Sequence, residues 1–174
     1  MFVFNGELRG VRVKADGRIG AEKIFNYVKR FDRGDLGAAL ERYDVVWFRL
    51  APRIDAFTTA FYDRLFLREP AVRRLFPANL REQRLKLADA LELAVRSLGH
   101  QIGLVPLLES LGEKHAAYGV TEAHFTLVGE VLIATLERFE GEHWTEATAA
   151  AWARAYAEIA SAMQRGLRRA VGSF

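Results

Sequence analysis

The sequence predicts an all-α domain, and three observations lead to that class. From Tyr43 onward, apolar residues recur at intervals of three and four, which is the spacing of one helix face. Prolines, threonines and glycines stand where helices should start or stop. The 174 residues are 51% hydrophobic and 27% charged, which is enough apolar material for the core of one domain.

Residues 1–42 differ from the rest and are expected to form an N-terminal extension of unknown role. Two short β-like stretches near residues 2–4 and 8–13 are compatible with a hairpin, and a helix is expected over about 21–33. The net charge of +3 lies wholly in this extension, where basic and acidic residues are mixed. This pattern is too weak to indicate nucleic-acid binding. The predicted domain therefore covers residues 43–174.

Residues 43–174 are expected to form a succession of amphipathic helices, most of them bounded by a local signal. Pro70 stands at a first-turn position, and Gly99 and Gly119 each follow an apolar helical pattern. Thr121 and Thr145 precede such patterns as N-caps. The expected helices cover about 43–51, a stretch from 55, 70–76, a long stretch between 77 and 99, 105–118, a stretch from 121 and a stretch from 145.

The amino-acid composition excludes several kinds of functional site. The absence of cysteine excludes disulfides, iron–sulfur clusters, thiolate ligands and cysteine nucleophiles. No H-x-H or H-x-x-x-H pair occurs, so a multi-histidine metal site on one helix is excluded, whereas a single imidazole ligating a prosthetic group stays open. The chain has neither a long apolar run nor a secretory leader, and we expect a cytoplasmic protein without membrane association. The four histidines are His100, His115, His124 and His143.

Three polar residues interrupt apolar helix faces. His115 lies on the face formed by Leu104, Leu108, Leu111 and Tyr118, Gln83 lies between Leu80 and Leu87, and Tyr62 shares a side with Leu65. A buried polar group must find a partner or cost a few kcal/mol. Each of the three side chains can hydrogen-bond to the backbone or to water inside a core, or it can belong to a functional site. His124 lies off the strongest apolar face, and a structural role is expected for it.

Around these residues the chain resembles the bacterial single-domain haemoglobins, which are related to the globin part of flavohaemoglobins. The resemblance spans about 43–170 and rests on the order of FYDRLFLREPAVRRLF, LGEKHAAYGV and HFTLVGEVL, and on the 32-residue interval from Gln83 to His115. It implies a globin fold around haem b (iron protoporphyrin IX). That haem would be non-covalent, because no thiol is available for attachment.

The resemblance also implies a role for each site residue. His115 matches the proximal ligand of the haem iron, and Tyr62 and Gln83 match the distal pair that hydrogen-bonds a gaseous ligand. Lys86 lies where a cation can reach a haem propionate. Two positions depart from the flavohaemoglobin pattern, because Phe125 replaces a tyrosine and Leu167 a glutamate. The remaining pocket residues are expected to be Phe61, Phe76, Leu87, Tyr118, Val120, Phe125 and Val128.

The function that the resemblance implies is tight O₂ binding with nitric-oxide dioxygenation. A separate reductase is expected, because the only glycine-rich candidate, Gly17-x-x-Gly20, lacks the dinucleotide-binding pattern. The alternative is an O₂ or NO sensor that signals through residues 1–42 or a partner chain. A haem-free interaction module is a third reading. For the extension, loose docking, dimerisation and weak contact of its basic helix with a membrane surface all stay open, and the chain is expected to be a monomer or homodimer.

Overall fold

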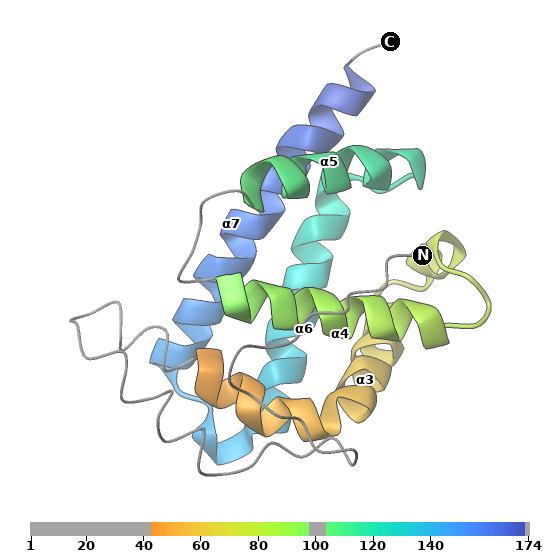
Figure 1. Cartoon of the computed structure of the whole chain (residues 1–174). Helices are drawn as coiled ribbons and strands as arrows, with labels where there is room; N and C mark the ends of the chain where they lie inside the picture. The colour runs from red at the N-terminus through yellow and green to blue at the C-terminus, as the bar shows by residue number, and fades with distance from the viewer. Residues whose placement is uncertain (1–42, 98–103, 173–174) are drawn as a thin grey trace, which may run out of the picture. The chain divides into compact units, whose positions relative to one another are not determined.

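The computed structural model describes residues 43–97 and 104–172 (Figure 1). The extension 1–42, with its expected hairpin and helix, and His100 lie outside these ranges. Within them the chain is helical and contains no strand, so the all-α prediction is confirmed. After a helical segment over 43–50 the elements are η1 (Ala51–Arg53), α3 (Ile54–Arg68), η2 (Pro70–Leu75), α4 (Arg81–Ser97), α5 (Leu104–Ala117), α6 (Glu122–Glu140), η3 (Gly141–His143) and α7 (Glu146–Val171).

Where the structure describes them, helix ends fall where the sequence signals place them, and the end expected at Gly99 lies outside the described residues. Pro70 begins the 3₁₀ helix η2, and the Thr145 hydroxyl caps α7 by accepting from the Thr148 amide at 3.1 Å. At the start of α6, the Thr121 amide donates to Nδ1 of His124 at 3.0 Å, which gives His124 the expected structural role. Gly119 follows α5 with φ of 79°, a conformation that favours glycine.

The helices form two packed groups, and α6 belongs to both. The helix α3 packs against α6, α4 and η2, while α5 packs mainly against α7. Since α6 contacts both α3 and α7, it joins the group that contains Tyr62 on α3 to the group that contains His115 on α5 (Figure 1). Phe57 and Leu136 are fully buried where α3 meets α6. Burial of such apolar side chains is the main stabilising contribution in a helical domain.

None of the described helices is by itself long and apolar enough to cross a membrane. Only α5 and the stretch Glu122–His143 taken together meet the criterion, across a bend of 112°.

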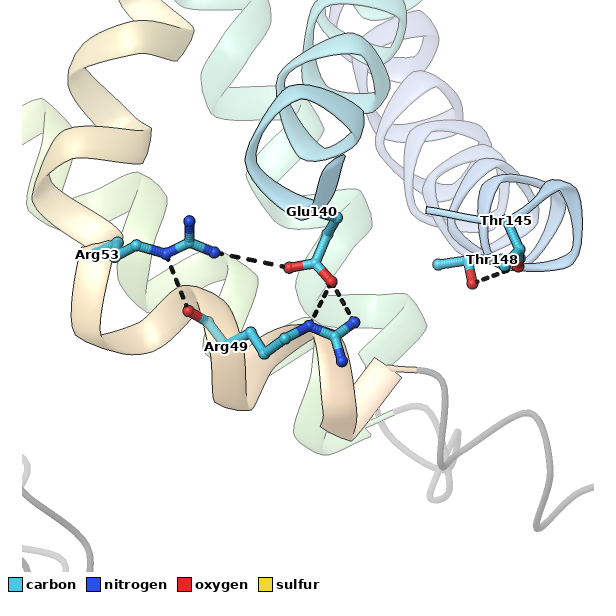
Figure 2. Close-up of polar contacts among 5 residues, drawn as sticks. All are labelled: Arg49, Arg53, Glu140, Thr145 and Thr148. Atoms are coloured by element: carbon cyan, nitrogen blue, oxygen red, sulfur yellow. Dashed lines mark hydrogen bonds and ion pairs between the residues drawn. The ribbon is translucent and has the colours of Figure 1, made fainter. Parts of the chain in front are cut away.

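A buried ion pair ties the first helical segment to the end of α6. The carboxylate of Glu140 has no exposed surface and accepts from the Arg49 guanidinium, with Nε to Oε2 at 2.7 Å (Figure 2). The second carboxylate oxygen lies 3.9 Å from Nη2 of Arg53. The Tyr43 hydroxyl adds a hydrogen bond of 2.8 Å to the carbonyl of Ala151 on α7. Segment 43–50 is thus held to α6 and α7 by specific polar contacts.

We predict that Arg49→Ala lowers the free energy of unfolding by about 2 kcal/mol in a urea titration. Removing one partner of a buried pair typically costs about 3–5 kcal/mol, and Arg53 still faces the carboxylate in this variant. The control is Arg68→Ala, which breaks an exposed pair with Glu130 and should cost about 0–1 kcal/mol. Equal effects of the two variants would contradict a stabilising role for the buried pair.

Candidate functional site

Aromatic side chains surround Tyr62 on α3. Phe61 and Phe76 meet its ring edge-to-face, with centroids 5.1 and 5.5 Å away, and Phe66 lies at 5.9 Å. Tyr62 and Phe61 are buried, and Phe76 and Phe66 are partly buried. These contacts are within the range in which aromatic pairs stabilise one another. The structure therefore brings three of the predicted site residues, Phe61, Tyr62 and Phe76, into one apolar cluster.

The hydroxyl of Tyr62 is a neutral hydrogen-bond donor in this cluster. Burial raises the pKa of Tyr62 to about 12, and contact with the Gln83 side chain acts in the opposite direction. The hydroxyl donates to the main-chain carbonyl of Gln83 at 3.3 Å, which is long for an O–H···O bond. Because this bond is weak, a stronger acceptor in the pocket can compete for the Tyr62 proton.

The first half of α4 supplies the other predicted distal residues. Gln83 and Leu87 are partly buried, and Leu87 packs against the main core. Lys86 is exposed instead, and its ammonium lies 2.9 Å from the carboxylate of Glu82 on the same helix. Since an exposed pair of this kind contributes little, it leaves Lys86 available to another anion. The propionate contact expected for Lys86 stays a prediction.

His115 lies near the end of α5 with one ring nitrogen engaged. Its Nδ1 is 2.7 Å from the carbonyl oxygen of Leu111, one turn earlier. A carbonyl only accepts, so Nδ1 is the donor, and in the neutral imidazole the lone pair then lies on Nε2. Among the described residues Nε2 has no hydrogen-bond partner. This is the arrangement in which a neutral imidazole ligates a metal, with the second nitrogen fixed by an acceptor.

The surroundings of His115 are apolar. The ring of Phe125 lies 6.3 Å from the imidazole and that of Tyr118 lies 6.2 Å away. Phe125 is buried in one cluster with Leu167, and Val120 packs against that cluster. The two positions at which the chain departs from the flavohaemoglobin pattern thus both hold packed apolar side chains. Val128, the last predicted pocket residue, is partly buried and packs against the main core instead.

The predicted apolar face of α5 is left partly uncovered by protein. Leu111 is 40% exposed and Tyr118 is 65% exposed, although both share the face of His115. The helix packs on α7 through a neighbouring face that contains Gly112, which the apolar periodicity did not single out. A partly uncovered apolar surface around an imidazole with a free Nε2 fits a large apolar group that takes one nitrogen ligand. The residues present therefore fit haem.

Comparison with known proteins agrees with this fit. The globin family model matches residues 59–163, and the chain belongs to the globin family. Membership, with flavohemoproteins among the relatives, implies that the chain binds haem. A flavohemoprotein of Bacillus subtilis is 29% identical over 111 residues, which cover 62% of this chain and 28% of the relative. One from Bordetella parapertussis is 32% identical over 126 residues, which cover 68% and 31%.

Solved structures show the same fold. A bacterial globin from Campylobacter jejuni superposes with a TM-score of 0.67 at 24% identity, covering 78% of this chain and 99% of that one. A flavohemoglobin from Malassezia yamatoensis with bound FAD and heme gives 0.66 at 19% identity, covering 77% of this chain and 37% of that one. The chain thus spans less than a third of the length of the curated flavohemoproteins that it matches.

We predict that Tyr62 makes folding stability fall between about pH 10 and pH 12. The phenol of an unfolded chain ionises near pH 10, whereas folded Tyr62 has a pKa of about 12. The contribution of Tyr62 to folding stability is therefore fully present below pH 10 and is lost as the pH rises from 10 to 12. The expected loss is about 2–3 kcal/mol, measured by urea unfolding at each pH. Tyr62→Phe should flatten this decline, and Tyr118→Phe, at an exposed site, should not. Equal slopes in both variants would contradict the burial argument.

Proposed function

We propose that this globin binds haem b through Nε2 of His115 and acts as a high-affinity O₂-binding protein with nitric-oxide dioxygenase activity. The observation that carries the proposal is the hydrogen bond between His115 and Leu111. The Nδ1 of His115 donates to the Leu111 carbonyl, and within the described part of the chain its Nε2 has no hydrogen-bond partner and lies on a partly uncovered apolar face. When bound, haem supplies the iron that takes up O₂ and exchanges electrons.

The hydrogen-bond partner of the His115 imidazole is a neutral group. Leu111 offers Nδ1–H a neutral carbonyl, and Phe125 and Leu167 offer it no acceptor side chain. A carboxylate partner would raise the basicity of the imidazole and favour peroxidase-like chemistry, whereas a carbonyl does so less. This side of the pocket therefore supports O₂ binding, and it favours neither peroxidase-like chemistry nor fast dioxygenation.

The distal residues supply hydrogen bonds in a dry environment. We assign Tyr62 as the principal donor, because its phenol is neutral at physiological pH and its present bond to Gln83 is long. The side-chain amide of Gln83 is the second donor. Phe61, Phe76 and Leu87 exclude water, which strengthens each hydrogen bond in the pocket. Such a pocket binds O₂ tightly and releases it slowly.

Dioxygenation needs an electron from outside the globin fold. One NO, one O₂ and one electron give one nitrate, so each turnover consumes a reducing equivalent. The relatives are flavohemoproteins, and the similarity covers less than a third of their length. We propose that a flavin reductase supplies this electron.

Gas sensing through residues 1–42 is the competing function, and those residues lie outside the described ranges. Catalytic turnover distinguishes the two functions, because sensing requires none.

We predict that the oxygenated protein, supplied with a flavin reductase and NADH, consumes NO catalytically and forms nitrate in equal amount. A single stoichiometric conversion without turnover would favour sensing.

We predict a Soret absorption band after haem is added to the purified protein. His115→Ala should lose the band or lower haem affinity by at least about tenfold, because the only proposed iron ligand is removed. The matched control is His143→Ala, at an exposed position in η3, which should keep the band unchanged. A protein that shows no band, or an unchanged band in His115→Ala, contradicts the proposal.

We predict that Tyr62→Phe and Gln83→Leu each release O₂ faster than the wild type in stopped-flow measurements. The loss of one hydrogen bond worth about 1.4 kcal/mol corresponds to a rate increase of about tenfold. Thr126→Ala, at an exposed position on α6, serves as the control. Unchanged rates in both distal variants would show that neither side chain bonds the gas.

A further inference from the structure

The helices α5 and α7 meet backbone to backbone at two glycines. A Cβ atom at Gly112 of α5 would lie 1.9 Å from the carbonyl oxygen of Met163 on α7. A Cβ atom at Gly166 of α7 would lie 1.8 Å from the carbonyl oxygen of Glu109 on α5. Both obstacles are main-chain atoms, so a side chain cannot rotate away to make room. The contact is reciprocal, and it permits only glycine at both positions.

Ion pairs hold the two helices together beside this crossing. The carboxylate of Glu109 accepts from Nε of Arg165 at 2.8 Å and lies 2.8 Å from Nη2 of Arg169. Arg169 also lies 3.3 Å from Glu113. These arginines lower the pKa of Glu109, so the carboxylate is charged at neutral pH. The helix α5 crosses α7 in Figure 1. The crossing is thus a close backbone contact flanked by opposite charges.

We propose that Gly112 and Gly166 are positioning residues that set how far His115 reaches into the haem pocket. His115 follows Gly112 by three residues, less than one helical turn, so a movement of α5 away from α7 carries the imidazole with it. Glycine is a poor helix former, and both glycines lie inside helices, Gly112 in α5 and Gly166 in α7. The inference rests on the proposed function, because it takes His115 as the haem ligand.

The test compares Gly112→Ala and Gly166→Ala with the wild type. In the ferrous haem complex, resonance Raman spectroscopy measures the iron–histidine stretching band, which reports the geometry of the proximal bond. We expect this band to shift in both variants and haem loss to be about tenfold faster or more. The control is Leu136→Ala, which opens a cavity in the core between α3 and α6 and should destabilise the fold without moving the band.

A second measurement follows α5 without haem. Because the chain has no cysteine, Lys114→Cys on α5 and Ala157→Cys on α7 can be spin-labelled uniquely, and both positions are exposed. We expect the label distance measured by electron paramagnetic resonance to lengthen in each glycine variant. A chain that binds no haem contradicts the proposed function, while the label distance still decides whether the glycines position α5.

Folded glycine variants with an unchanged iron–histidine band, or with an unchanged label distance, would overturn the inference. A band that shifts equally in Leu136→Ala would overturn it as well, because general loosening would then explain the effect. If neither glycine variant folds, Glu109→Gln decides, since it weakens the crossing without adding volume. A shifted band in Glu109→Gln supports the inference, and a wild-type band overturns it.

Discussion

The backbone contact between α5 and α7 is the constraint on which the proximal side of this globin depends. The helix α5 carries His115, and its main packing partner is α7. Since Gly112 and Gly166 let the two backbones touch, α5 uses a narrow face for packing and leaves the face of His115 and Tyr118 partly uncovered. The same contact therefore positions α5 and leaves exposed the apolar surface that a prosthetic group requires.

The two sides of the proposed pocket are built differently. Tyr62 belongs to the largest buried cluster and is braced by the rings of Phe61 and Phe76, so its position follows from core packing. His115 lies outside that cluster and is oriented by one hydrogen bond to Leu111 and by the ring of Phe125. The proposed distal donor, Tyr62, is thus held by many weak contacts, whereas the proposed iron ligand, His115, is held by a few specific ones.

Apolar side chains pack near His115 at both positions that depart from the flavohaemoglobin pattern. Phe125 and Leu167 lie in one buried cluster, and the Tyr156 hydroxyl donates to the carbonyl of Phe125. Neither the Phe125 side chain nor the Leu167 side chain can accept a hydrogen bond from the imidazole. The neutral carbonyl of Leu111 is the acceptor instead, and it is provided by the helix itself. The difference from the flavohaemoglobin pattern is therefore electronic, while the fold is shared.

Residue order alone predicts the all-α class, the helix ends at Pro70, Thr121 and Thr145, and the polar residues Tyr62 and His115 on apolar faces. These features depend on local bonding and on periodicity, which the residue order records. Tertiary packing alone shows that Gly112 faces α7, that Tyr118 is exposed and that Arg49 reaches Glu140, 91 residues away. Periodicity tells which residues share a face of a helix. It does not tell which face meets a neighbour, because that choice depends on how closely two backbones can approach and on what remains to cover the other face.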